Sequence, residues 1–366
     1  MAERSITARY SDPLDALWLG VASKVGLDVR RSEEVFASTD GRGTLSIGEP
    51  STLDPDDCLA QMVFHELCHS LVEGHESFER PDWGLGNYDG RDLMREHACL
   101  RTQAHLARRH GLARVLAPTT EHRRFYDGLG LVPLSGTDES VVLARRAVAR
   151  SARDPWAPHL EEALGRTRKM LEQVQDYAPR ASLLADLEAP LDKHPSGLWS
   201  HPAPPGSCGE CAWFGDGCQQ VLLSLDPRTP ACERFEREVA CEHCGACCRE
   251  AYDCLDIGED DPAGARFASH VERVGGRRVM LRVEGRCPML DGGGETPYRC
   301  ARYDERPQTC RDFTRGGEHC AEARRRVGLG LEPPGLGFGI GPGYPGSLRF
   351  LEPTGRLAVR QFPVPV

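Results

Sequence analysis

Lysine, long apolar runs and excess positive charge are what this sequence has least of. Lys24, Lys169 and Lys193 are its three lysines, so arginine supplies the other 42 of its 45 basic residues. We interpret that bias as codon usage, and the net charge of −10 argues against a surface that wraps nucleic acid. No stretch approaches the roughly 20 apolar residues that cross a bilayer, and the first 13 residues lack the basic and apolar segments of a secretion signal. We therefore expect a cytoplasmic protein with no membrane segment and no nucleic-acid partner.

Cysteine, by contrast, is abundant. The 366 residues include 16 cysteines, and 13 of them fall between Cys208 and Cys320. In a reducing compartment, clustered thiols are metal ligands more often than they are disulfides. The sequence therefore predicts a metalloprotein, whose oligomeric state it leaves open.

Composition divides the chain into five segments. A stretch rich in proline, glycine and serine, residues 191–207, is typical of a linker. Residues 1–190 before it form one expected domain, which carries few cysteines. After it we expect a four-cysteine module at 208–235, a larger cysteine domain at 241–325 and a Gly/Pro-rich arm at 326–366.

The pattern of apolar residues, caps and turns predicts an α+β protein: a mainly helical N-terminal domain with a small hairpin, then a loop-rich cysteine domain. One helix should begin with Asp54 as its N-cap and end at Gly74, and a second should end at Gly111. A hairpin should turn at Asp40–Gly43. The expected helices are residues 13–25, 55–73, 92–110 and 155–177, and a second hairpin is expected within 348–360.

The second of these helices carries two histidines and a glutamate in an HExxH motif. His65 and His69 are four residues apart, so both imidazoles project from one face and can reach the same metal ion. Glu66 stands beside the first ligand, where it can move protons as the catalytic acid or base. The motif predicts a site that holds iron or zinc.

Such a site usually has a third protein ligand and an open position. Glu73 lies too far along the helix from His65, by roughly 12 Å of rise, and is expected to orient a ligand instead. Glu96 on the next predicted helix is the preferred third ligand, with His97 and Asp92 as alternatives.

Two resemblances meet at this motif. HExxH followed by a glutamate on a later helix resembles the gluzincin metallopeptidases. A longer match, from His65–His69 through Asp82-Trp83-Gly84 and Asp89-Gly90-Arg91 to Glu96 and Gln103, is similar to the elongation factor P hydroxylase family. The aromatic run after the family's glycine is here Leu85-Gly86-Asn87 and is one residue shorter. This resemblance implies iron in a 2-His-1-carboxylate site and O₂-dependent hydroxylation of a side chain, with a protein as the substrate.

The larger cysteine domain contains four thiols within eight positions, followed by three more. Short CxxC spacing lets successive thiolates converge on one ion or cluster. The pattern, which ends in C-x-Y-x-x-R-P-x-x-C-R-x-F, resembles the CxxCxxCC family of zinc- or iron-chelating domains, which includes flagellin lysine N-methylases. The resemblance implies seven ligands: Cys241, Cys244, Cys247, Cys248, Cys287, Cys300 and Cys310.

Seven thiols exceed what one zinc needs, so two zinc ions and an iron–sulfur cluster of the 4Fe–4S type both remain open. Cys254 and Cys320 fall outside the shared pattern and are either further ligands or plain thiols. The four-cysteine module looks similar to the small cluster modules of certain glycyl-radical enzyme subunits. Its candidate ligands, for an iron–sulfur cluster or zinc, are Cys208, Cys211, Cys218 and Cys232.

Three functions follow from these motifs. The first is an iron-dependent hydroxylase that receives electrons from its cysteine-bound metal. The second is a zinc peptidase in which Glu66 is the base and the cysteine domain is structural. The third is a non-enzymatic protein that chelates zinc or iron.

Overall fold

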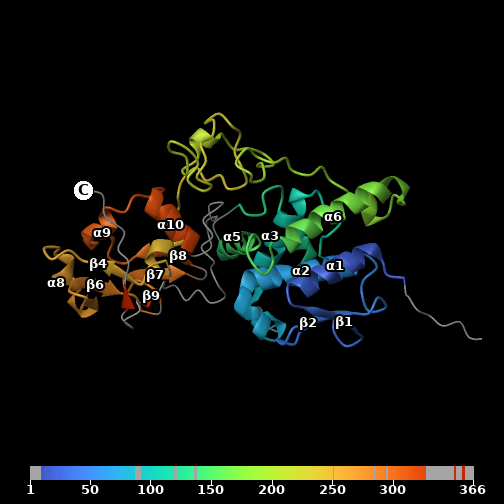
Figure 1. Ribbon diagram of the computed structural model, residues 1–366, viewed down its shortest axis with the longest axis horizontal. Helices are drawn as coiled ribbons and strands as arrows, with labels where there is room; N and C mark the ends of the chain where they lie inside the picture. Colours follow the sequence, from blue (N-terminus) through green and yellow to red (C-terminus); the bar gives the residue numbers. More distant parts are fainter. Residues whose placement is uncertain are drawn as a thin grey trace, which may run out of the picture. The chain divides into compact units, whose positions relative to one another are not determined.

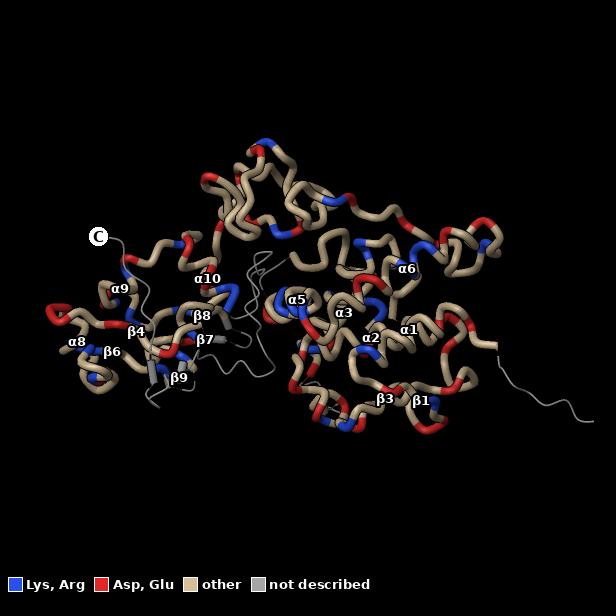
Figure 2. The backbone as a smooth tube through the Cα atoms, viewed as in Figure 1, with Lys and Arg blue, Asp and Glu red and all other residues tan. Residues whose placement is uncertain are grey.

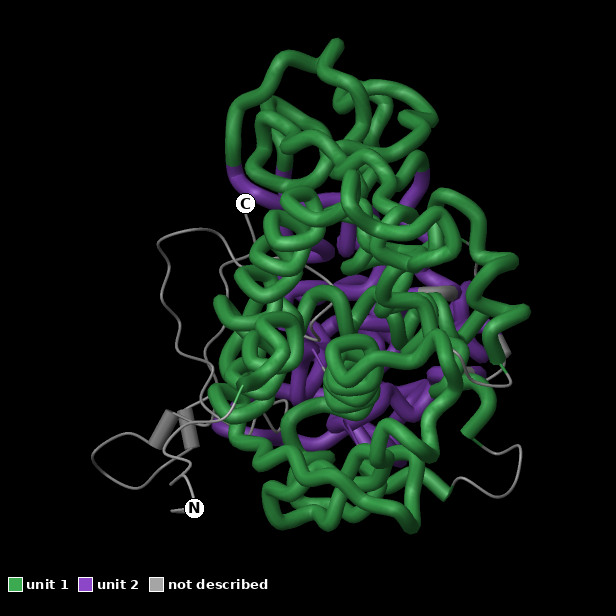
Figure 3. The backbone as a smooth tube through the Cα atoms, turned by 90° about the vertical axis from the view of Figure 1, so that its right-hand side faces the viewer, with its two compact units in different colours: residues 1–218, 223–237 green, residues 219–222, 238–366 purple. Residues whose placement is uncertain are grey.

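The computed structural model describes residues 10–86, 92–118, 122–135, 138–249, 251–283, 285–293, 296–326, 350–351 and 357–358. The chain forms two compact units, shown in green and purple in Figure 3. Unit 1 comprises residues 1–218 and 223–237, and unit 2 comprises 219–222 and 238–366. The contacts thus group the 208–235 cysteines with the helical part of the chain, whereas composition had set them apart. Helices and small sheets occur in both units, as an α+β fold requires.

Unit 1 is organised around one buried helix, α2 (Leu59–Glu73). It packs against α1 (Pro13–Lys24), α3 (Leu93–Arg109) and α5 (Glu139–Arg150) (Figure 1). Every residue from 59 to 72 is buried, so this helix has no solvent-facing side. Its polar side chains must therefore find partners within the protein, because a buried charge without one is costly.

The predicted end of α2 is correct and its predicted start is not. Gly74 closes the helix with a φ of +90°. The helix begins at Leu59, because residues 54–57 close their own turn: the Asp54 N–H donates to the Asp57 carboxylate. Cys58 is the residue that caps it, with its Sγ 3.4 Å from the Gln61 nitrogen.

The other helices follow the predicted pattern with shifted ends. Gly111 follows α3 as expected, with a φ of +67°. The fourth predicted helix, α6 (His159–Val174), begins after Pro158 rather than at Pro155, because a residue that precedes proline is disfavoured in a helix. Helix α5 and the short α4 (Arg123–Asp127) were not predicted. The buried face of α5 consists of Ser140, Val141, Ala144, Ala147, Val148 and Ala149.

A three-stranded sheet packs at the edge of this helical core. Strands β2 (Ala37–Thr39) and β3 (Thr44–Gly48) form the predicted hairpin around Asp40–Gly43. Strand β1 (Asp28–Ser32), which was not predicted, pairs parallel to β3 and makes it the central strand. Leu45 and Ile47 of β3 are fully buried in the core of unit 1.

The rest of unit 1 is irregular. After α6 come three single 3₁₀ turns, η4 (Gln175–Tyr177), η5 (Leu183–Ala185) and η6 (Cys208–Glu210). Two further 3₁₀ turns, η1 (His75–Glu79) and η2 (Asp82–Gly84), follow α2. The η2 turn lies close to α2 and β2, which places it beside the HExxH motif.

Unit 2 consists of short elements. Strands β4 (Cys254–Asp256), β6 (Arg277–Leu281) and β5 (Val271–Val274) form a sheet in that order, and β7 (Leu290–Gly293) pairs with β8 (Thr296–Cys300). The predicted C-terminal hairpin is present as β9 (Phe350–Leu351) and β10 (Leu357–Ala358). The helices are α7 (Cys241–Cys244), α8 (Ala263–Arg266), α9 (Gln308–Arg311) and α10 (Glu318–Arg326), and the 3₁₀ turns are η7 (Ala246–Cys248), η8 (Ala268–His270) and η9 (Tyr303–Glu305).

Acidic and basic residues are interspersed along both units (Figure 2). Within the described part of the chain, no helix combines the length and the apolar character that crossing a bilayer requires.

Candidate metal centres

Helices α2 and α3 bring three potential metal ligands together inside unit 1. The Nε2 atoms of His65 and His69 are 3.2 Å apart. The Glu96 carboxylate approaches His69 Nε2 at 3.2 Å through one oxygen and His65 Nε2 at 3.8 Å through the other. Metal–nitrogen bonds of about 2.0–2.1 Å place neighbouring ligands of one ion roughly 3 Å apart. The three side chains therefore have the spacing of a metal site.

Gln103, which lies seven residues after Glu96 on α3, sets the orientation of His65. Its amide nitrogen donates to the Leu116 carbonyl at 2.8 Å, which leaves its oxygen 2.9 Å from His65 Nδ1. An amide oxygen only accepts, so His65 carries its proton on Nδ1 and presents the Nε2 lone pair toward His69 and Glu96. This is the tautomer that a metal ligand needs, and such outer partners commonly orient ligating histidines.

Cys99 is a rival third ligand, because potential ligand atoms of His65, His69 and Cys99 lie within 4.8 Å of one another. Its Sγ, however, lies 3.8 Å from His65 Nδ1, the nitrogen that Gln103 occupies. Glu96 faces the free nitrogen instead. One Glu96 oxygen is also buried without a hydrogen-bond partner among the described residues, as expected of an atom that serves a metal. The arrangement favours Glu96.

Electrostatics agree with an ionised Glu96. Burial raises its pKa, but the His69 and His65 imidazoles outweigh burial and hold that pKa at about 2. Burial lowers the pKa of His69, and the Glu96 and Glu66 carboxylates raise it above its ordinary value.

Glu66 is held beside this site by a tryptophan in a strained turn. The Trp83 Nε1–H donates to the Glu66 carboxylate at 2.7 Å, and both side chains are buried. Asp82 and Trp83 have φ values of +48° and +58°, which non-glycine residues adopt at a cost of about 1–3 kcal/mol. Ser38 Oγ and the Thr39 N–H, both on β2, donate to the Asp82 carboxylate and hold the turn. This turn therefore fixes the Glu66 carboxylate through one of its oxygens.

The alternative ligands make other contacts. His97 stacks on Phe125, with 3.7 Å between ring centroids, and the Asp92 carboxylate accepts from the Gly86 N–H. Glu73 forms an ion pair with Arg95. Among the described residues, no contact between Glu73 and His65 or His69 accompanies its expected role of orienting a ligand.

Replacing Gln103 by leucine is expected to weaken metal binding at His65 and His69 by about 10- to 100-fold, because Nδ1 then loses its acceptor and the tautomer is no longer fixed. Metal titration of the apoprotein would measure this change. Gln103→Glu keeps the acceptor for His65 but loses the donor to the Leu116 carbonyl, and it should bind metal more tightly than Gln103→Leu. Equal affinity of Gln103→Leu and wild type would show that the amide does not orient His65.

In unit 2, a tight loop gathers the first four thiols of the larger cysteine domain. Helix α7 ends at Gly245, which has a φ of +58°; a Cβ added there would lie 3.0 Å from the Tyr298 ring, closer than an ordinary contact. The η7 turn follows at once and ends with Cys247 and Cys248, whose Sγ atoms are 3.9 Å apart. The loop thus needs glycine between its cysteine pairs.

The later cysteines reach this loop through backbone pairing. The Cys287 N–H donates to the Cys248 carbonyl at 2.7 Å, and Cys300 pairs with Leu290 across the β7–β8 hairpin. Burial, followed by the charges of Cys248, Cys287 and Cys300, raises the pKa of Cys310 to about 12. We group Cys248, Cys287, Cys300 and Cys310 as one candidate set of four ligands.

A second set of four includes a cysteine outside the predicted seven. Burial, and then the charges of Cys244 and Cys241, raises the pKa of Cys320 on α10. The hydrogen bond with Cys248, then burial and the charges of Cys248, Cys244 and Cys241, raises the pKa of Cys247. The same bond lowers the pKa of Cys248, with help from Arg282. We group Cys241, Cys244, Cys247 and Cys320 as the second candidate set. Burial, and then charged neighbours that include no thiol, raises the pKa of Cys254.

Arginines fix the backbone around these thiols. Arg282 donates to the carbonyls of Cys247 and Cys248 at 2.8 and 3.2 Å. Arg311 donates to the carbonyls of Arg306 and Asp304, and Arg306 stacks on the Tyr303 ring. Arg282 thus fixes the backbone at Cys247 and Cys248, whereas Arg306 and Arg311 fix the loop that carries Cys310.

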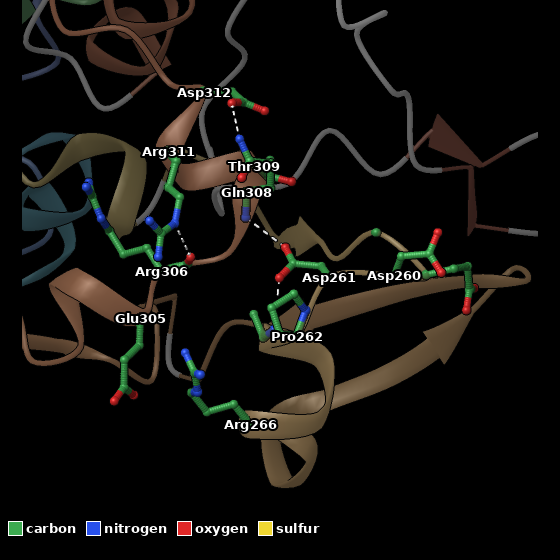
Figure 4. A pocket seen from close by; sticks show the side chains of 13 residues that line it. Asp260, Asp261, Pro262, Arg266, Glu305, Arg306, Gln308, Thr309, Arg311 and Asp312 are labelled. Atoms are coloured by element: carbon green, nitrogen blue, oxygen red, sulfur yellow. Dashed lines mark hydrogen bonds between the residues drawn. The ribbon is translucent and has the colours of Figure 1, made fainter.

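A hollow of about 580 Å³ lies beside this loop (Figure 4). Asp261 in its wall accepts from the backbone N–H groups of Ala263 and Gln308, and the Gln308 side chain donates to Asp312. The Asp261 carboxylate in this hollow is thus occupied by hydrogen bonds to nearby backbone groups, and no cysteine is among the residues that line the hollow.

The thiols of the four-cysteine module lie in unit 1. Burial and then Cys218 and Cys211 raise the pKa of Cys208. Burial, partly offset by a backbone hydrogen bond, raises that of Cys232 to about 12, and Cys218 and Cys211 add to it. Backbone hydrogen bonds connect Cys211 to Cys208, and Cys208 to Thr229, three residues before Cys232.

The two candidate sets comprise eight thiols of unit 2. They lie on the loop around Gly245 and on the strands and helices that return to it. Residues 240–325 match the CxxCxxCC domain. That family is described as a zinc- or iron-chelating domain, and the match spans all eight thiols of the two sets. No curated protein and no solved structure shows significant similarity to the chain. This match supports metal binding by the CxxCxxCC domain. It does not extend to unit 1, whose site rests on the geometry of His65, His69 and Glu96.

Proposed function

We propose that the protein is an iron-dependent oxygenase that hydroxylates a protein side chain, with its electrons supplied by cysteine-bound iron. The observation that carries the proposal is the convergence of His65, His69 and Glu96, with His65 oriented by Gln103. Two histidines and one carboxylate on one face are the ligand set of non-haem iron oxygenases. Iron bound there would activate O₂ in the positions that the protein leaves open.

The protein's own residues have three tasks in this reaction. His65, His69 and Glu96 hold the metal on rigid, packed helices. Glu66 accepts a hydrogen bond from Trp83 through one carboxylate oxygen and transfers a proton through the other. The buried surroundings, in which His65, His69 and Glu66 are each under 9% exposed, keep bulk water from the reacting centre.

The overall reaction needs an electron source. Hydroxylation of a C–H bond by O₂ inserts one oxygen atom and reduces the other to water, which consumes two electrons and two protons. The sequence of the Gly-rich arm predicts no strand-then-helix context, which a dinucleotide-binding fingerprint requires. Cysteine-bound iron is then the donor within the chain, as an iron–sulfur cluster of the 4Fe–4S type or as mononuclear thiolate iron.

A zinc peptidase is the second candidate, because the same three ligands and Glu66 would also serve metal-assisted hydrolysis. The burial of the motif favours the oxygenase: O₂ and one side chain need less access than an extended peptide. Protein purified without oxygen distinguishes these functions, because iron with acid-labile sulfide supports the oxygenase and zinc alone contradicts it. Metal without either activity would leave a chelating protein.

Glu66→Gln is expected to keep the metal and to lower turnover at least 100-fold, because the amide keeps the Trp83 hydrogen bond but cannot accept a proton. Metal content and substrate-dependent O₂ consumption are the measurements. Glu79→Gln, the same change at an exposed position, is the control. Loss of metal from Glu66→Gln would make Glu66 a ligand rather than a base.

The electron supply is tested in a single turnover. Chemically reduced wild type should consume O₂ without an added 2-oxoacid, whereas Cys244→Ser should keep its histidine-bound iron and consume little. Rapid mixing with oxygenated buffer measures both. A Cys244→Ser protein that consumes O₂ at the wild-type rate would show that this cysteine domain supplies no electrons.

A further inference from the structure

Residues 191–237, which belong to unit 1 apart from 219–222, are ordered with almost no core of their own. Their regular structure is the single η6 turn, and none of their residues joins the main hydrophobic core of the unit. Trp213 is the large apolar side chain that this segment buries most fully. Ordering a residue costs roughly 1–2 kcal/mol of backbone entropy, so a segment of this length needs another source of stability.

Backbone pairing brings the four cysteines of this segment together. Ser200 pairs with Cys232, Ser207 with Pro230, and the Cys208 N–H donates to the Thr229 carbonyl at 2.8 Å. Phe214 pairs with Cys218 across a tight turn. Cys208 and Cys232 are buried, Cys211 and Cys218 are partly buried, and all four thiols are free. Four free thiols on adjoining turns are the donor set of a four-thiolate metal site, and metal bound there would supply the stability that the small core of this segment does not.

We propose that Cys208, Cys211, Cys218 and Cys232 bind a metal centre of their own, separate from the CxxCxxCC domain, which fastens residues 191–237 to α3. The centre is a four-thiolate site, which suits a zinc ion or an iron–sulfur cluster. It lies outside residues 240–325 and does not depend on the proposed oxygenase activity.

A buried carboxylate next to the site links it to α3. Glu233, which follows Cys232, lies 3.0 Å from Arg109 and 3.0 Å from His105 on α3, and its side chain is 4% exposed. The Glu233 N–H donates to the Trp199 carbonyl, and the Leu191 N–H donates to the Arg109 carbonyl. A metal at Cys232 therefore fixes Glu233 against the helix that also carries Glu96 and Gln103.

Full-length protein purified without oxygen tests the metal centre. Zinc, iron and acid-labile sulfide per chain are compared among wild type, Cys211→Ser, Cys232→Ser and the control Cys58→Ser. Cys58 is a thiol of unit 1 that caps α2, a task that serine also performs. We expect both test variants to lose one centre, either one zinc or the iron and sulfide of one cluster, and the control to lose none. Unchanged metal in the test variants would overturn the proposal.

Hydrogen exchange tests the link to α3 and remains informative if the cysteine variants fold poorly. Glu233→Gln retains all four thiols and should keep its metal, but amide exchange in 191–201 and 230–237 should accelerate at least tenfold. Asp226→Asn, an exposed change in the same segment, should exchange like wild type. Wild-type exchange in Glu233→Gln, or metal loss from it, would overturn the link to α3.

Discussion

Replacing His65 or His69 by alanine is expected to remove one metal ion per chain and to leave the cysteine-bound metal in place. Each imidazole supplies one of three protein ligands, and the remaining histidine and Glu96 cannot hold the ion at micromolar concentrations. The cysteine sites share no ligand with this one. Elemental analysis of full-length protein purified without oxygen, with metal counted per chain, measures the change.

His97→Ala is the matched control, because His97 lies next to Glu96 on α3 but stacks on Phe125. It should retain the full metal content. If His65→Ala or His69→Ala also emptied the cysteine sites, the metal centres would not be independent. If His97→Ala lost the ion, the ligand set derived from α2 and α3 would be incorrect.

Cys247→Ser and Cys248→Ser are each expected to release metal from the CxxCxxCC domain and to expose it to proteolysis. Structural zinc contributes about 10–16 kcal/mol to folding in small metal-dependent domains, and loss of one of four thiolates removes much of that. Unit 2 has little to replace it, since one of its core clusters consists of Cys244, Ala246, Ala251 and Ala323. Metal content and digestion rate, with and without a chelator, report the two effects.

Cys254→Ser provides the control for both changes. Cys254 is a half-buried thiol on β4 in the same domain, and charged residues rather than thiols are its main electrostatic neighbours. It should keep its metal and resist proteolysis like wild type. Equal resistance of all three variants would show that Cys247 and Cys248 are incidental thiols. Cys320→Ser should behave like Cys247→Ser if the two sets of four bind separate ions.

Glycines and turn residues in the sequence were sufficient to predict where two helices end and where one hairpin turns. Gly74 and Gly111 end α2 and α3 as predicted, and Asp40–Gly43 marks the β2–β3 hairpin. Competing local interactions account for the errors: the Asp54–Asp57 turn delays α2, and Pro158 delays α6. Strand β1 was missed because its pairing with β3 is parallel and has no turn signal between adjacent strands.

The sequence by itself determined which residues could bind metal. The i, i+4 spacing of His65 and His69 follows from the helical repeat, and the CxxCxxCC spacing brings its thiols into one loop, so both depend on short-range geometry alone. Tertiary structure decided the rest. Packing of α3 on α2 places Glu96 rather than His97 or Asp92 at the histidines, and places Gln103 against His65. Chain folding also brings Cys320 to Cys244 and joins Cys208–Cys232 to unit 1. Contacts between residues far apart in sequence depend on how whole elements pack, which no local spacing specifies.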